Sequence, residues 1–352
     1  MLGAPRAALP ATLLVAGLLA GCAAGVSNTV PAAAPAVAPL GGPPPAGTVV
    51  PLGAPATAVV VDSRTGTVAV ALTDPPRLVL RTLDGPAPPQ AVPPQDGPPR
   101  EVPLPGPAAD LVLAAPGGPL LVPVATPGCL IRVPLQGGAP SRTDLTGSAR
   151  GAVTVGRAGT AGGVTVVALG DRLVVLTGSS KPVSIPGFSD ATRLVPAGAP
   201  GGGKIWVLDR GRSAVSVVDV SSGVISPALR AGNGAANAVA DRFARMLVTD
   251  TRDGELLAFA GDPPVLRQRF PLPGAPWALA YDGRRDLAWV TLTARDEVVG
   301  LDVAAGEPVI VHRFRTVHEP NSVAVDPVSG RVLVASASGA GLQVIDPERV
   351  VQ

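Results

Sequence analysis

Short apolar runs alternate with turn residues along most of this chain. From residue 47 onward, runs rich in Val, Leu and Ala are separated by Gly, Pro, Asp and Ser. Such runs with tight turns between them predict β-strands. The apolar residues fill consecutive positions rather than alternate ones, which predicts strands that are covered on both faces. The pattern therefore predicts an all-β protein whose sheets are buried on both sides.

The strand pattern repeats about every 44 residues. Copies begin at Ala56, Ala235, Pro276 and Pro320, a fifth lies in residues 201–223, and two degenerate ones start at Ala109 and Gly151. Each copy holds four short apolar runs, and one such unit cannot bury both of its faces alone. Seven repeats of a four-stranded unit predict a seven-bladed β-propeller with four-stranded antiparallel blades.

The two ends of the chain share one blade in this interpretation. The stretch PLGAPATAVVVD at residues 51–62 returns as PLPGAPWALAYD at residues 271–282, so an outer strand should precede each repeat. The last repeat stops after its third strand, and GTVVPLGAP at residues 47–55 is a strand left over at the other end. We expect this N-terminal strand to pair in the last blade, which closes the ring and removes two open sheet edges.

The repeats resemble those of a known family. KIWVLDRGRSAVSVVDVSSG and PNSVAVDPVSGRVLVAS are similar to the YVTN-type repeats of lactonase-like seven-bladed propellers, with the YVTN phrase relaxed to WVLD at 206–209, LVTD at 247–250 and LVAS at 333–336. The resemblance spans residues 47–352 and implies the propeller fold. For activity it implies only that a lactonase-like hydrolase is one alternative.

The N-terminus predicts an export signal and a lipid anchor. Residues 1–21 carry Arg6 and then an apolar run too short for a membrane-spanning helix, which is typical of a signal peptide. The run ends in Leu-Ala-Gly-Cys, which resembles the lipobox of bacterial lipoproteins. We expect Cys22 to become the lipidated (palmitate-bearing) first residue on the outer face of the cytoplasmic membrane. An ordinary secretory signal with an incidental Cys is the alternative.

Two further segments complete the domain organisation. Residues 22–46 comprise the lipidated Cys and a Pro/Ala-rich tether, expected to hold the folded domain away from the bilayer. Residues 47–352 form the propeller domain, expected to be a monomer. The remaining cysteine, Cys129, is expected to be a buried apolar residue, with a reactive thiol as the alternative.

Composition limits the classes of function. The net charge is +2 with charges scattered along the chain, so no nucleic-acid partner is expected. Only two histidines, His312 and His318, are present, too few with the available Cys for a zinc cluster. Neither a Ser/His/Asp order nor a G-x-S-x-G elbow occurs. The recurrent Trp and calcium-ligand positions of quinone dehydrogenases are also missing. We therefore predict no metal, no cofactor and no catalytic residue.

The predicted binding site lies at one end of the central channel, here called the mouth. There the entries to the first strands face the loops between the second and third strands. The predicted site residues are Trp277, Asn237 and Asn321 at strand entries, with Arg210, Arg295 and His318 on the rim. An aromatic side chain beside amide groups suits recognition of a polar ligand or a protein tail. The alternative is that these loops are ordinary solvated surface.

Other conspicuous residues have structural explanations. Asp62, Asp282 and Asp326 each precede a turn, where a carboxylate caps the local backbone. Trp206 and Trp289 occupy the same second-strand position and are expected in the core. The sequence thus favours a non-catalytic binding scaffold for a protein or small polar ligand. The alternative, a lactonase-like hydrolase, would use His318, Glu319 and neighbouring Arg at the same mouth.

Overall fold

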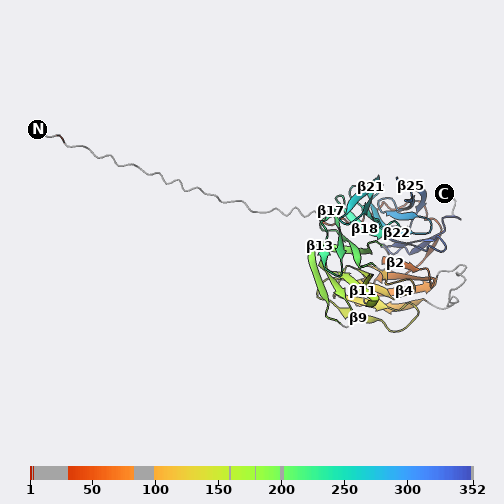
Figure 1. Ribbon diagram of the computed structural model, residues 1–352. Helices are drawn as coiled ribbons and strands as arrows, with labels where there is room; N and C mark the ends of the chain where they lie inside the picture. Colours follow the sequence, from red (N-terminus) through yellow and green to blue (C-terminus); the bar gives the residue numbers. More distant parts are fainter. Residues whose placement is uncertain are drawn as a thin grey trace.

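Antiparallel sheets arranged in a ring make up the folded part of the chain in this computed structural model (Figure 1). The structure describes residues 31–82, 99–157, 160–178, 180–198 and 202–349, together with Met1 and Gly3. Cys22 and almost all of the predicted signal peptide lie outside these ranges. Within them, no helix has the length and apolar character needed to span a membrane.

Five sheets have four strands each, paired as neighbours in chain order apart from the last. The first is β2 (Ala56–Asp62), β3 (Thr67–Thr73), β4 (Pro76–Thr82) and β5 (Arg100–Pro103), and the second is β6 (Val112–Leu113), β7 (Leu120–Val124), β8 (Cys129–Val133) and β9 (Ser141–Asp144). Two more are β18 (Ala235–Ala240), β19 (Met246–Asp250), β20 (Glu255–Ala260) and β21 (Val265–Pro271), then β22 (Pro276–Asp282), β23 (Leu287–Leu292), β24 (Glu297–Asp302) and β25 (Val309–Arg315). The last joins β26 (Pro320–Val325), β27 (Val332–Ser336) and β28 (Leu342–Ile345) to β1 (Thr48–Val50).

The stretch from residue 151 to 230 forms one eight-stranded sheet, where the sequence predicts two separate blades. Its strands are β10 (Gly151–Arg157), β11 (Thr160–Ala168), β12 (Gly170–Leu176), β13 (Val183–Pro196), β14 (Lys204–Asp209), β15 (Ala214–Asp219), β16 (Val224–Ile225) and β17 (Leu229–Arg230). Strand β13 is long enough to pair with β12 through residues 183–186 and with β14 through residues 193–196. The two four-stranded units are therefore continuous, because no turn separates them.

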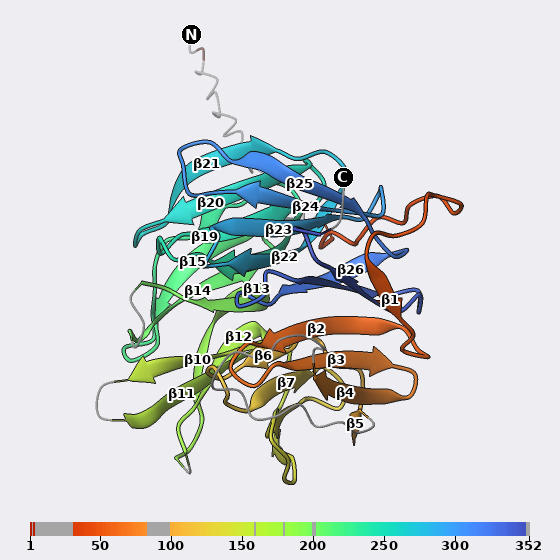
Figure 2. The same cartoon turned by 90° about the vertical axis from the view of Figure 1, so that its right-hand side faces the viewer.

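The innermost strands contact one another in a closed circle. In ring order they are β2, β6, β10, β13, β18, β22 and β26, which returns to β2. The predicted closure is confirmed, because β1 pairs antiparallel with β28 through Thr48–Val344, Val49–Gln343 and Val50–Leu342. Figure 2 shows β1 beside the blue C-terminal strands. The ends of the folded domain are thus held in one sheet.

The core is built from Val, Leu and Ala, as the composition requires. Trp206 and Trp289 are 2% and 1% exposed, which confirms their predicted burial. Gly300 lies opposite Trp289 on the next strand, and a Cβ added there would be 2.9 Å from the indole ring. A larger residue at this position would displace the Trp. Cys129 is fully buried, as expected.

The three repeated aspartates cap turns, as predicted. The Asp62 carboxylate accepts hydrogen bonds from the Thr65 N–H at 3.1 Å and the Thr65 hydroxyl at 2.6 Å. Asp326 accepts from the Ser329 N–H at 3.1 Å, and Asp282 accepts from the Arg284 N–H at 2.9 Å. Each carboxylate therefore satisfies backbone donors of the turn between the first and second strands of its blade.

Candidate functional site at the mouth of the ring

Strand direction gathers the loops of the mouth at one end of the ring. In an antiparallel sheet, the turn between strands two and three lies at the end where strand one begins. Arg210 and Arg212 follow β14, Arg252 follows β19, and Arg295 follows β23. The entries of β18, β22 and β26 lie at this same end. The turn carrying Phe243, between β18 and β19, lies at the opposite end.

Arg210 and Trp277 meet at the mouth. The guanidinium carbon of Arg210 lies 5.2 Å from the centroid of the Trp277 indole, a cation–π distance. Trp277 is half-buried at the entry of β22 and packs against the cluster formed between the last two blades. The structure thus brings together a rim residue and an entry residue that come from different blades.

Further arginines lie near this pair. Burial lowers the pKa of Arg210; Asp190 opposes this shift, and the nearby Arg193, Arg150 and Arg252 add to it. Asp110 forms an ion pair with Arg193, and Asp190 lies 3.9 Å from Arg150. Arg210 thus lies among three further arginines, and Asp110 and Asp190 are the carboxylates nearest to them on this side of the mouth. Guanidinium groups that are partly removed from water favour carbonyl, carboxylate or phosphate oxygens as hydrogen-bond partners.

The two predicted asparagines have different surroundings. Asn237 is 8% exposed, and its Oδ1 accepts a hydrogen bond from the Ala238 N–H at 3.0 Å, so the side chain supports its own strand entry. Asn321 is half-buried, and its Oδ1 has no hydrogen-bond partner among the described residues. Of the two, Asn321 keeps a free acceptor.

His318 belongs to a polar group beside the mouth. Its Nδ1 lies 2.8 Å from Asp296 Oδ2, and its Nε2 lies 3.9 Å from Glu319 Oε1. Asp296 also accepts from the Glu319 N–H at 3.1 Å, which holds the loop after β25 against the loop after β23. The carboxylate orients the imidazole, as an accepting group does when it selects a histidine tautomer.

A cavity of about 520 Å³ adjoins this group. Residues 294–297 and 315–318 form one wall, and residues 38–45 form the other. Arg295 is exposed on the rim, and its side chain packs over Gly274, where a Cβ would lie 3.1 Å from the Arg295 Cδ. The cavity therefore lies between the two last blades and the N-terminal part of the chain.

Residues 31–38, here called the N-terminal segment, lie on the mouth. Arg252 donates to the Pro31 carbonyl, Arg210 donates to the Ala33 carbonyl, and the Ala36 N–H donates to Thr293 Oγ1 at 3.0 Å. Ala33 and Ala38 are 5% and 6% exposed. The sequence predicts a tether that extends away from the domain over residues 22–46. The structure instead places residues 31–46 against the propeller.

Sequence reasoning missed several of these residues. Arg150, Asp190 and Thr293 give no signal in the repeat, because each is brought to the mouth by neighbours from other blades. The N-terminal segment was also missed, because a Pro/Ala-rich composition indicates an unfolded spacer. The only available signal was the excess of Arg in the loops between second and third strands.

An acidic cluster lies close to the mouth. Asp250, Asp253 and Glu255 bring carboxylate oxygens within 4.8 Å of one another, a spacing that could hold a cation. Asp250 accepts hydrogen bonds from the Asn233 and Gly234 N–H groups at 2.9 Å each, and Glu255 pairs with Arg269 at 2.7 Å. Backbone donors and Arg269 thus already meet these charges.

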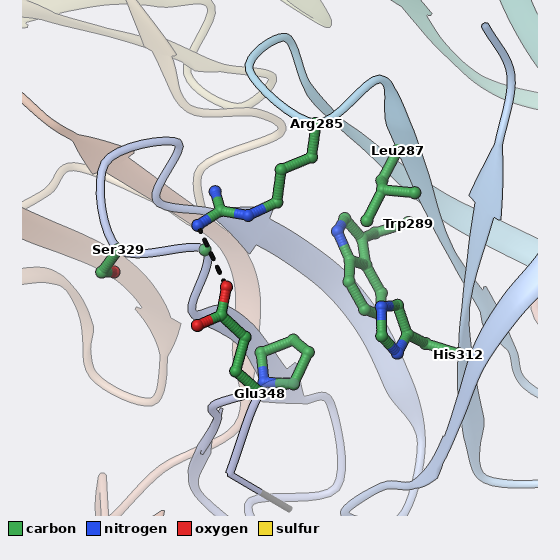
Figure 3. A pocket seen from close by; sticks show the side chains of 8 residues that line it. Arg285, Leu287, Trp289, His312, Ser329 and Glu348 are labelled. Carbon is green, nitrogen blue, oxygen red and sulfur yellow. Dashed lines mark ion pairs between the residues drawn. The ribbon is translucent and has the colours of Figure 1, made fainter.

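A second, smaller cavity is lined by residues of the turns at the opposite end of the ring, among them Arg285 and Ser329. Figure 3 shows these side chains. The volume of this cavity is about 50 Å³, room for one or two water molecules. Its lining includes Trp289 and His312, whose rings stack 5.4 Å apart, and the ion pair of Arg285 with Glu348 at 3.7 Å. Burial lowers the pKa of His312. This cavity is too small for a substrate and belongs to the packing of the last blades.

Comparison with solved structures shows the propeller fold. The chain is similar to the Cps50 (Swd1) β-propeller domain of Myceliophteria thermophila, with 13% identity, a TM-score of 0.68 and coverage of 86% of this chain and 99% of that one. It is also similar to virginiamycin B lyase from Staphylococcus aureus, with 14% identity, a TM-score of 0.64 and coverage of 83% of this chain and 94% of that one. Kuenenia stuttgartiensis hydrazine synthase is similar as well, with 15% identity, a TM-score of 0.66 and coverage of 85% of this chain and 98% of that one. At such identities the likeness shows the fold alone. No family model matches the chain, and no curated protein matches it.

Proposed function

We propose that this chain is a membrane-anchored, extracytoplasmic lipoprotein whose propeller is a non-catalytic scaffold that binds a protein or small polar ligand at the mouth. The observation that carries the proposal is the guanidinium of Arg210 over the Trp277 indole at 5.2 Å, surrounded by three further arginines. An aromatic ring beside partly buried guanidinium donors is typical of recognition sites.

The scaffold is proposed to have seven blades. The eight-stranded sheet counts as two of them, because β13 is the outer strand for β12 and the inner strand for β14. The circle of first strands supports this count, since β10 and β13 each take one place in it. The two units share the uninterrupted strand β13, and the outer strand of the second unit is divided into β16 and β17, which both pair with β15.

Anchoring is proposed to occur through Cys22, on the strength of the Leu-Ala-Gly-Cys end of the N-terminal apolar run. Cys22→Ser should release the protein from the membrane fraction or leave an uncleaved precursor, because two or three acyl chains are needed for stable anchorage. Fractionation followed by mass spectrometry of the N-terminus measures both. Cys129→Ser is the matched control and should remain anchored. A Cys22→Ser protein that is processed and still requires detergent would contradict the anchor.

The binding role is tested in the intact, anchored protein with a photo-crosslinking residue at Ser338. This side chain is exposed in the loop between β27 and β28 at the mouth, and the same probe at Phe243, 44% exposed at the opposite end, is the control. We expect a discrete crosslinked species from position 338 only. Arg210→Ala should reduce it about tenfold or more, since hydrogen bonds to a charged group contribute roughly 1.5–3 kcal/mol. Equal labelling at both positions, or no effect of Arg210→Ala, would count against the proposal.

The second candidate is a lactonase-like hydrolase that uses the same mouth. The His318–Asp296 distance of 2.8 Å and the adjoining cavity favour it, because an oriented imidazole beside a cavity can act as a general base. Lactone turnover that is lost in His318→Ala and retained in His312→Ala would favour this candidate. If the protein does not hydrolyse lactones and Ser338 still crosslinks, the result favours the scaffold.

A further inference from the structure

We propose that the mouth is a receptor for an extended peptide rich in Pro and small residues, and that the N-terminal segment is its resident occupant in cis. This inference rests on the proposed binding role of the mouth and names the class of ligand. A ligand of that class must displace residues 31–38 before it can bind. The anchor-proximal part of the chain is thus a built-in competitor for the site.

The contacts of the segment are those of a bound peptide. Two guanidinium groups from different blades donate to its backbone carbonyls, Arg252 to Pro31 and Arg210 to Ala33. The Ala36 N–H of the segment donates to Oγ1 of the fully buried Thr293 at 3.0 Å. These contacts are all made to the peptide backbone, and residues of three blades hold the segment at positions 31, 33 and 36.

The composition of the segment explains why it fits. Pro31 and Pro35 lack an N–H and favour the extended polyproline II form, which leaves two fewer backbone donors that would need partners. Alanine side chains allow close approach, and Ala33 and Ala38 are buried whereas the intervening Ala34 and Val37 are exposed. Aromatic-lined grooves with polar donors are a general way to bind such peptides. Trp277 provides the aromatic surface next to the Arg210 donor.

The site retains unused binding capacity even when the segment is in place. Arg210 Nε is buried and has no hydrogen-bond partner among the described residues, and the same holds for Asn321 Oδ1. A buried donor and a buried acceptor without partners are unfavourable, so a ligand that meets them would bind better than the segment. A covalently attached segment nevertheless competes at a high effective concentration. Ligand binding should therefore depend on how firmly residues 31–38 are held.

The test opens the site in the full-length, detergent-solubilised protein. Ala33→Trp should displace the segment, because Ala33 is 5% exposed and has no room for an indole. Ala34→Trp is the matched control, since the neighbouring Ala34 is exposed. The probe is a fluorescein-labelled peptide with the sequence of residues 31–39, PAAAPAVAP, with its C-terminus amidated so that it offers carbonyls and no carboxylate. Fluorescence anisotropy measures the Kd of this peptide. Hydrogen exchange at the Ala36 N–H shows whether the segment is still bound at the mouth, because this N–H donates to Thr293 Oγ1.

We expect the peptide to bind at least tenfold more tightly to Ala33→Trp than to the parent or to Ala34→Trp. Protection of the Ala36 N–H should be lost only in Ala33→Trp. Adding Arg210→Ala to Ala33→Trp should weaken peptide binding about tenfold. Thermal melts of Ala33→Trp and Ala34→Trp should coincide with that of the parent, because the segment lies outside the sheets.

Three outcomes would overturn the inference. They are an unprotected Ala36 N–H in the parent protein, equal peptide affinity in Ala33→Trp and Ala34→Trp, and binding only of a peptide with a free C-terminal carboxylate. If any of these occurs while Ser338 still crosslinks in an Arg210-dependent manner, the binding role stands and only the ligand class is wrong. Tight peptide binding to the opened variant without crosslinking at Ser338 would support the inference and count against the wider scaffold role.

Discussion

A chain that lacks residues 47–53 is expected to lose roughly 3–6 kcal/mol of unfolding free energy, the sum of one buried Leu and several ladder hydrogen bonds. These residues contain β1, whose three residue pairs with β28 close the ring. Leu52 is 9% exposed and packs in the cluster between the first and last blades. Their loss also leaves β28 as an open edge, which favours aggregation. Guanidinium chloride unfolding followed by Trp fluorescence measures the change.

The control for this deletion is a chain that begins at residue 41. It lacks the N-terminal segment and keeps β1, so it separates the stability due to the strand from any due to residues 31–38. We expect its free energy of unfolding to remain within about 0.5 kcal/mol of that of the parent, as for changes away from the core. A chain without residues 47–53 that unfolds at the parental midpoint would show that β28 does not need its partner.

Gln343→Leu is expected to cost about 3–6 kcal/mol, although it exchanges a polar residue for an apolar one of similar size. Gln343 is fully buried on β28. Its Oε1 accepts from the Val317 N–H at 2.9 Å, and its Nε2 donates to the Ala46 and Arg315 carbonyls at 2.6 and 2.8 Å. Leucine would leave the buried Val317 N–H without this acceptor, at roughly 1–3 kcal/mol. It would also remove the side-chain donor from the part-buried Ala46 and Arg315 carbonyls, at about 1 kcal/mol each. Chemical unfolding and the thermal midpoint check the loss.

Gln268→Leu is the matched control for this substitution. Gln268 is half-buried on the outer strand β21, and its Oε1 accepts from Arg245 Nη1 at 3.1 Å. Arg245 keeps its bonds to Asp241 and to the Val303 carbonyl, so the cost should stay below about 1 kcal/mol. If Gln268→Leu and Gln343→Leu lower the free energy of unfolding by similar amounts, the hydrogen bonds of the Gln343 amide to Val317, Ala46 and Arg315 do not contribute the expected stability.

Local sequence was sufficient for the strands, the turns and the order of the units. A tight turn with a capping Asp is determined by a few neighbouring residues, so Asp62, Asp282 and Asp326 could be interpreted directly. Trp206 and Trp289 share one position in the repeat, and equivalent positions of a repeat have equivalent burial. The strand at residues 48–50 could be assigned to the last blade by counting, because a ring of four-stranded units leaves one strand unpaired.

The candidate site was only partly predictable. Trp277 and Arg210 could be assigned to the mouth because strand direction places entries and second loops at one end. Their contact at 5.2 Å could not, since it depends on the distance across the ring between residues of different blades. The same is true of Arg193 with Asp110 and of His318 with Asp296. Each pair joins residues of different blades, and the repeat does not determine which of these side chains meet.

The sequence by itself determined the repeat, the all-β fold and the closing strand, because these follow from short-range patterns of apolar and turn residues. Only the tertiary structure decided three other features. These are the uninterrupted course of β13 through two units, the burial of Gln343 between chain segments almost 300 residues apart, and the seating of residues 31–38 on the mouth. Each depends on contacts between distant parts of the chain. Residues 31–38 are held by guanidinium donors from the blades. The composition of the segment gives no sign of these donors, because a Pro/Ala-rich composition by itself predicts a free spacer.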